Sequence, residues 1–170
     1  MKIVVKTVES AEHEARFNHI RPLYHEALNL VERLHRRLLD VIKDEFDRRG
    51  RVDINSVQAL LLYNIGDKEL SAGELGTRGY YLGSNVSYNL KKLVETGFLD
   101  HQRSSVDRRS VRIKLTDKGR DVRDIVEALC QKHVCTVEQV GGIKAAELVT
   151  LNKTLHRLER FWSDQILYHL

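Results

Sequence analysis

Short polar side chains and two lysines gather in the stretch LGSNVSYNLKKLVETGFL, residues 82–99. Val86, Leu90 and Leu93 recur at helical spacing, which predicts a short helix that packs by one narrow apolar face. Short polar groups at a helix tip can read base edges in the major groove of DNA, and lysines further along are better placed for phosphates. The residues with which this helix would contact DNA are Ser84, Asn85, Ser87, Tyr88, Lys91 and Lys92.

The same pattern also describes a capped surface helix whose polar face is only solvated, so the distribution of charge matters. Residues 91–120 hold nine Lys or Arg and four Asp or Glu, a local net charge of +5. The whole chain carries +4 with a pI of about 9.1, so the rest of it is close to neutral. A local basic excess is typical of a face that binds a polyanion.

A basic hairpin is predicted directly after this helix. Residues 98–103 and 110–115 have the length and apolar alternation of two strands joined by a polar connection. An arginine at the hairpin tip can enter a minor groove, where the potential is strongly negative, and a neighbouring carboxylate can orient it. The charged candidates in this hairpin are Arg103, Asp107, Arg108 and Arg109, with Asp107 as the orienting partner of Arg109. A charged hairpin that only keeps the chain soluble is the alternative.

Most of the remaining chain has helical periodicity. Apolar residues recur at spacings of three and four from about Pro22 to Arg49 and again from Leu148 to Trp162. Asn55 or Ser56 can cap a second helix, Ser71 a third and Thr116 a fifth, which Gly141-Gly142 would end. The apolar face expected of that fifth helix consists of Val122, Ile125, Val126, Leu129 and His133.

This order predicts a mainly α protein with a small β-hairpin wing, that is, a winged helix-turn-helix with long N- and C-terminal dimerisation helices. The two long apolar seams have no obvious partner inside so small a core, so we expect them to pack against a second copy of the chain. The predicted domains are 1–50 for the N-terminal region and long dimerisation helix, 51–116 for the DNA-binding lobe and 117–170 for the C-terminal dimerisation helices.

The run from about Glu74 to Gly119 resembles the winged-helix core of the MarR family of bacterial transcription regulators. The matching features are a recognition helix ending in glycine, Asp-x-Arg at the hairpin tip (Asp107 to Arg109) and Leu-Thr-x-x-Gly in LTDKG (residues 115–119). The resemblance implies a recognition tip at Ser84, Asn85, Ser87 and Tyr88 and a minor-groove contact by Arg109. It also implies an obligate homodimer, joined through its terminal helices, often with a small-molecule pocket between the lobe and those helices.

Two features depart from the common family pattern. The turn GTRGYYLG is richer in Gly and Tyr than usual, and Asn89 stands where the family usually has an apolar residue. We therefore expect an unusual angle between the third and fourth helices. The run GYYLGSNVSYNLKKLVE is similar to the sequences of an alphaproteobacterial branch of the family that regulates L,D-transpeptidase genes.

An effector site would need polar or aromatic groups on otherwise apolar faces, because ligand pockets are mostly apolar with a few convergent polar groups. Such residues are also common in cores, where only their polar end needs a partner. The candidates are Tyr24, His25, His35, Tyr63, Tyr80 and Tyr81. No cofactor is expected, and the effector would be a small organic molecule of unknown identity.

Metal and enzyme chemistry are not favoured. Cys130 and His133 share a helix face, but Cys135 points elsewhere, so three ligands would not converge on zinc. Oxidation of Cys130 or Cys135 remains an alternative mode of regulation, although cysteine is often only a small buried hydrophobe. The chain has no P-loop, GxGxxG, HExxH or GxSxG motif.

The sequence therefore predicts a homodimeric regulator that binds double-stranded DNA at a pseudo-palindromic operator and responds to a ligand. No membrane span or signal peptide is apparent and cysteine is scarce, so a cytoplasmic location is expected. A winged helix used as a protein-interaction scaffold is the rival interpretation, and the local charge argues against it.

Overall fold

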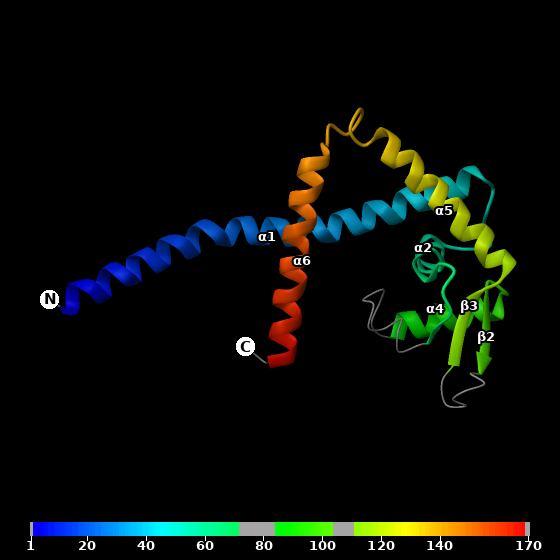
Figure 1. Ribbon diagram of the computed structural model, residues 1–170, viewed down its shortest axis with the longest axis horizontal. Helices are drawn as coiled ribbons and strands as arrows, with labels where there is room; N and C mark the ends of the chain where they lie inside the picture. The colour runs from blue at the N-terminus through cyan, green and yellow to red at the C-terminus, as the bar shows by residue number, and fades with distance from the viewer. Residues whose placement is uncertain (1, 72–83, 104–110, 169–170) are drawn as a thin grey trace.

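The computed structural model describes residues 2–71, 84–103 and 111–168. Figure 1 shows a lobe built from the shorter helices and the strands at one end of a very long first helix, which the last helix crosses. The predicted fold class, mainly helical with a β-hairpin wing, is confirmed. The elements are α1 (Lys2–Arg48), α2 (Ser56–Ile65), β1 (Leu70–Ser71), α4 (Ser84–Glu95), β2 (Leu99–Arg103), β3 (Val111–Leu115), α5 (Asp117–Thr136) and α6 (Ala145–Tyr168).

The first helix is longer than predicted. Apolar spacing places its start near Pro22, but α1 spans 47 residues and Pro22 lies inside it. A proline inside a helix removes one backbone hydrogen bond and crowds the preceding turn, and proline is also favoured at helix starts. The helical turns on both sides of Pro22 outweigh this local loss. At about 1.5 Å per residue, α1 is about 70 Å long and extends well beyond the lobe (Figure 1).

The predicted caps of α2 and α5 are present. The Asn55 side chain accepts from Gln58 N–H at 2.9 Å, and the Gln58 side chain accepts from Asn55 N–H at 3.3 Å, which completes a capping box. Gly66 ends α2 with a φ of 61°. Thr116 begins α5 by accepting from Gly119 N–H at 3.1 Å. Helix starts that depend on such local hydrogen bonds are well determined by sequence.

The end of α5 differs from the prediction. The helix stops at Thr136, before the Gly141-Gly142 pair, and a turn follows in which Val140 N–H donates to the Thr136 carbonyl at 2.8 Å. His133, expected on the apolar face of this helix, is exposed. The reason is that only the first turns of α5 lie against the lobe, whereas its last turns extend past it (Figure 1).

The sheet contains a third strand that the sequence pattern did not predict. Strand β3 pairs antiparallel with β2 on one side, as a hairpin requires, and with the two-residue β1 on the other. Leu70 of β1 lies opposite Ile113 of β3, and both are buried. Two residues are too few to show the alternation by which strands are recognised in sequence.

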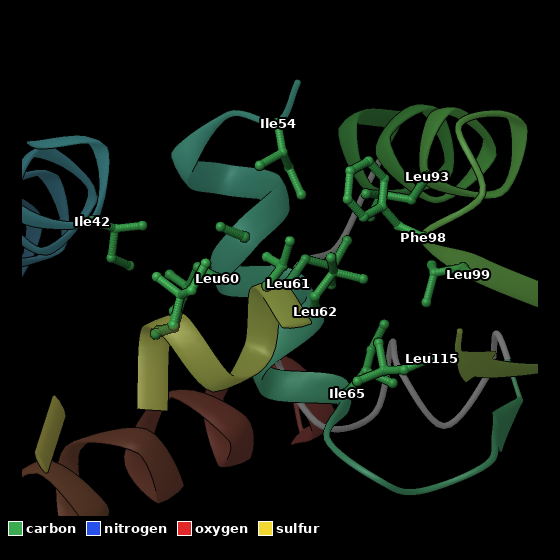
Figure 2. Packing of buried hydrophobic residues seen from close by; sticks show 14 of the residues in the cluster. Ile42, Ile54, Leu60, Leu61, Leu62, Ile65, Leu93, Phe98, Leu99 and Leu115 are labelled. Carbon is green, nitrogen blue, oxygen red and sulfur yellow. The ribbon is translucent and has the colours of Figure 1, made fainter. Parts of the chain in front are cut away.

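One apolar core joins the lobe to the end of α1. Figure 2 shows Ile42 of α1 beside the leucines of α2, with Leu93 of α4 and Phe98 on the far side. This packing fixes where α4 stands relative to α2 and the hairpin. The core consists of Ile42, Phe46, Ile54, Ala59, Leu60, Leu61, Leu62, Ile65, Leu70, Leu93, Phe98, Leu99, Ile113, Leu115, Val122, Ile125, Val126 and Leu129.

The terminal helices leave much of their apolar surface exposed. No residue of α6 is buried, and the core residues of α1 all lie near its C-terminal end. The two helices meet where Trp162 Nε1 donates to the Tyr24 hydroxyl at 3.0 Å. Within the described ranges, no helix is long and apolar enough to cross a membrane. The large exposed apolar residues include Ile20, Leu23, Leu30, Val31, Leu34, Leu38 and Val41 on α1, and Val149, Leu151, Leu155, Phe161, Trp162 and Ile166 on α6.

Candidate nucleic-acid interface

Helix α4 has one buried and one exposed face. Leu93 is fully buried, and Asn89, Leu90 and Val94 are half-buried around it. The exposed face carries Ser87, Tyr88, Lys91 and Lys92, which at about 100° per residue fall within an arc of about 140°. Ser84 and Asn85 form the first turn of α4, but their side chains lie outside the described part of the structure. The separation of faces agrees with the sequence, while DNA contact by these residues stays a prediction.

Bonds within the chain occupy some of the basic residues that give the 91–120 window its charge. Lys118 Nζ donates to the Thr96 carbonyl at 3.1 Å. Arg120 Nη1 donates to the Leu115 carbonyl at 2.9 Å, and its other terminal nitrogen pairs with Asp117. Lys118 and Arg120 therefore stabilise the fold through these bonds, which sequence composition does not reveal.

The remaining cations differ in how free they are. Lys91 and Lys114 lie 3.9 and 3.7 Å from neighbouring carboxylates, which makes them loose, exposed pairs of little energetic weight. Lys92 and Arg112 are exposed, and their side chains have no partner among the residues that the structure describes. Among the described basic residues of the 91–120 window, Lys92 and Arg112 are therefore the most available to phosphates.

The wing is only partly described. Arg103 ends β2 opposite Val111, and its side chain is outside the described set. Asp107, Arg108 and Arg109, the predicted wing tip, also lie outside the described residues. On β3, Arg112 and Lys114 are exposed while Ile113 and Leu115 are buried, so the basic side chains of this strand point away from the core.

The predicted effector residues do not form one site. Tyr24 bonds to Trp162, and His25 stands beside Tyr24 with ring centroids 6.4 Å apart, all where α1 meets α6. His35 is exposed further along α1. Tyr63 lies elsewhere, against the core of the lobe. Tyr80 and Tyr81 lie outside the described residues.

A groove of about 470 Å³ lies between α1 and α6. Apolar side chains form most of its wall, and a few polar groups stand among them, as in ordinary ligand sites. The apolar spacing of the sequence places Val31, Leu155, Leu158 and Trp162 in helical seams, but it does not predict the groove, because the groove depends on how the two helices cross. Its wall is formed by Val31, Asn152, Leu155, His156, Leu158, Glu159, Trp162, Ser163 and Ile166.

Tyr63 is held by α5 and is not a free polar group. Burial of its ring, followed by the charges of Cys130 and Glu127 and hydrogen bonds to these two residues, raises the pKa of Tyr63 to about 12. Gln131 Nε2 in turn donates to the Glu127 carboxylate at 2.7 Å. The Tyr63 hydroxyl therefore stays protonated and ties α2 to α5.

We expect Tyr63 to make the protein less stable at high pH. Its pKa is about 12 in the folded chain and 10.0 ordinarily, so between these values the unfolded chain loses a proton that the folded chain keeps. The contribution of the protonated Tyr63 hydroxyl to the stability of the folded chain is present below the unfolded pKa and is lost as pH rises toward the folded pKa. Urea unfolding measures the free energy of unfolding at about pH 8 and about pH 11. Between these two pH values, that free energy should fall more for wild type than for Tyr63→Phe. Equal drops would contradict this assignment.

Cys130 and Cys135 are not placed to form a disulfide with each other within one chain. Cys130 is half-buried and Cys135 is exposed, and both are free thiols. Five residues apart on a helix, their Cα atoms are about 9 Å apart, which is beyond the span of a disulfide. The described residues also contain no group of three or more His, Cys, Asp or Glu side chains placed to bind a metal.

Comparison with known proteins gives consistent matches. Residues 54–119 match a family model described as a winged helix DNA-binding domain. Over 145 residues the chain is 37% identical to the exopolysaccharide II synthesis transcriptional activator ExpG of Rhizobium meliloti (strain 1021), across 85% of this chain and 74% of ExpG.

Solved structures match over most of the chain. FabT of Streptococcus pneumoniae, in complex with DNA, has a TM-score of 0.62 at 22% identity, over 83% of this chain and 98% of FabT. A mutant MarR from E. coli, complexed with operator DNA, has a TM-score of 0.62 at 21% identity, over 84% of this chain and 96% of that one. At these identities the likeness concerns the fold.

Proposed function

Because the chain belongs to the MarR family of winged-helix transcription regulators, we propose that it works as a homodimer on a pseudo-palindromic operator and responds to a small organic ligand. The family makes it a regulator and not an enzyme. The observation that carries the DNA-binding proposal is the exposed face of α4, whose Ser87, Tyr88 and Lys92 stand clear of the core.

On this proposal, residues along α4 and on β3 have separate roles. Ser87 and Tyr88, near its N-terminal end, reach base edges, since a recognition helix reads DNA mainly with its first turns. Tyr88 is 66% exposed, which suits a side chain that becomes buried only against DNA. Lys92 and Arg112 neutralise phosphates and supply affinity without sequence preference.

The dimer is proposed from the unpartnered apolar surface of α1 and α6 that lies outside the wall of the groove. On α1, the residues that pack on the lobe and the exposed Leu34, Leu38 and Val41 lie on neighbouring faces, so the helix has a second apolar face left over. Single soluble chains rarely leave an apolar surface this extended. Two copies joined along these helices would hold two α4 helices about one DNA turn apart, roughly 34–36 Å.

The ligand is proposed to bind in the groove between α1 and α6. Asn152 and His156 offer polar contacts on an otherwise apolar wall, and Trp162 offers a flat aromatic face. A ligand that prefers one crossing of α1 and α6 would shift the spacing of the two lobes, since differential affinity moves such an equilibrium.

The direct test of DNA binding is Lys92→Ala. We expect it to weaken binding to the operator and to random duplex alike, roughly tenfold for a dimer, and to flatten the dependence of log K on log salt by about 0.9 per protomer. The cause is the loss of one phosphate contact that does not depend on base sequence. Fluorescence anisotropy over a salt series measures both quantities.

Lys153→Ala is the matched control, because it removes the same charge from an exposed position on α6. It should leave both affinities and the salt dependence near those of wild type. A wild-type chain that binds neither duplex at low salt would favour the protein-interaction scaffold instead.

A further inference from the structure

The C-terminal end of α4 is closed by a compact turn. Phe98 N–H donates to the Leu93 carbonyl at 2.9 Å and Gly97 N–H to the Val94 carbonyl at 3.0 Å, the two bonds of a Schellman motif. Gly97 adopts a φ of 76°, which glycine allows without strain. This turn leaves three successive carbonyls, those of Thr96, Gly97 and Phe98, facing the start of α5.

The first turn of α5 binds all three carbonyls. Lys118 Nζ donates to the Thr96 carbonyl at 3.1 Å, and Thr116 Oγ1 donates to the Gly97 carbonyl at 2.7 Å. Thr116 N–H donates to the Phe98 carbonyl at 3.1 Å. The same Thr116 hydroxyl accepts from Gly119 N–H, so one side chain both caps α5 and holds the end of α4.

Lys118 is held from three directions. Besides the Thr96 carbonyl, its ammonium lies 4.0 Å from the centroid of the Phe98 ring and 3.9 Å from the Asp53 carboxylate. Asp53 is itself fixed by two hydrogen bonds from Arg51, of 2.9 and 3.3 Å. Although the Lys118 side chain is 48% exposed, these contacts orient its charge toward the protein.

We propose that Thr116 and Lys118 are positioning residues, which set the angle at which α4 meets DNA and so its discrimination between base sequences. The proposal rests on the proposed function of α4 as the recognition helix. Lys118 belongs to the basic window of the sequence, but on this proposal it contacts no phosphate. A small tilt of α4 would misplace its base contacts while leaving backbone attraction nearly intact, because only base contacts carry sequence information.

The test compares Lys118→Met with Lys118→Arg and with Lys114→Met as a control. Lys118→Met keeps an unbranched side chain but removes the ammonium, and with it the hydrogen bond to the Thr96 carbonyl and the contacts with the Phe98 ring and the Asp53 carboxylate. Lys118→Arg can still donate to the Thr96 carbonyl. Lys114→Met removes the same charge at nearly the same exposure, 47%, from strand β3. Thr116→Val removes the hydroxyl that donates to the Gly97 carbonyl, and Thr116→Ser keeps it, so this pair tests the second contact in the same way.

We expect Lys118→Met to lower operator affinity about tenfold, or about 1.4 kcal/mol, and random-duplex affinity by less than about twofold. Lys118→Arg should restore the operator-to-random ratio, and Lys114→Met should leave that ratio unchanged. In the free protein, Lys118→Met should also speed amide hydrogen exchange at Gly97 and Phe98 without altering α2.

An equal loss on both duplexes with a flatter salt dependence would identify Lys118 as a phosphate contact and overturn the proposal. Unchanged discrimination with unchanged exchange would overturn it too. If wild type binds neither duplex, the proposed function itself fails, whereas the exchange rates still report whether Lys118 holds the end of α4.

Discussion

A Leu34→Glu chain should be a folded monomer that binds its operator about 10²–10⁴-fold more weakly than wild type. Leu34 is 63% exposed in the single chain and takes no part in the lobe core, so its replacement leaves that core intact. In the proposed dimer it would lie in the apolar seam of α1, where an unpaired carboxylate loses its hydration. Sedimentation equilibrium measures the oligomeric state and anisotropy measures operator affinity.

The affinity falls because two linked recognition helices bind two half-sites as one event, and a monomer loses this advantage. Arg36→Gln is the matched control, since it lowers the net charge by one unit, as Leu34→Glu does. Arg36 is exposed on α1, two residues away from Leu34. The Arg36→Gln chain should remain a dimer with wild-type operator affinity. A Leu34→Glu chain that is still dimeric and still binds tightly would rule out the proposed α1 interface.

Gly119→Ala should destabilise the chain more than any other single methyl group added at a described glycine of the lobe. A Cβ built at Gly119 would lie 2.1 Å from the Phe98 carbonyl oxygen and 3.4 Å from the Leu115 side chain. Because the nearest obstacle is backbone, α5 would have to move away from the end of α4. We expect a loss of roughly 3 kcal/mol in the free energy of unfolding, measured by urea denaturation.

Gly50→Ala provides the comparison for a glycine that is needed only for its backbone angle. Gly50 has a φ of 68° but open space around its Cα, so alanine there pays the left-handed strain alone, about 1–2 kcal/mol. If Gly119→Ala costs no more than Gly50→Ala, the close packing of α5 on Phe98 is not the reason for a glycine at position 119.

Much of the recognition lobe could be predicted because its signals are local. The capping box of Asn55 and Gln58 involves residues three apart, as does the Thr116 cap with Gly119. The alternation of buried Ile113 and Leu115 with exposed Arg112 and Lys114 has a period of two. Such short-range patterns express backbone geometry directly, so they locate α4, the hairpin and α5 from sequence alone.

Local patterns do not tell which of the charged residues are bonded within the fold. Lys118 and Lys92 look alike in sequence, but one is bound to the Thr96 carbonyl 22 residues away and the other is free among the described residues. Likewise, the sequence does not show that the Tyr63 hydroxyl bonds to Glu127 and Cys130 of α5, 64 and 67 residues away. Strand β1 exists only because β3 lies beside it.

The amino-acid sequence by itself determined the positions of α2, α4 and the hairpin, the start of α5 and the polar face of α4, because each depends on residues within a few positions of one another. Only the tertiary structure decided which cations are free, how α5 holds the end of α4 and where α6 meets α1. The Trp162 to Tyr24 bond, which joins residues 138 apart, is one example. Pairings at such separations depend on the path of the whole chain through its core, and no local spacing encodes that path.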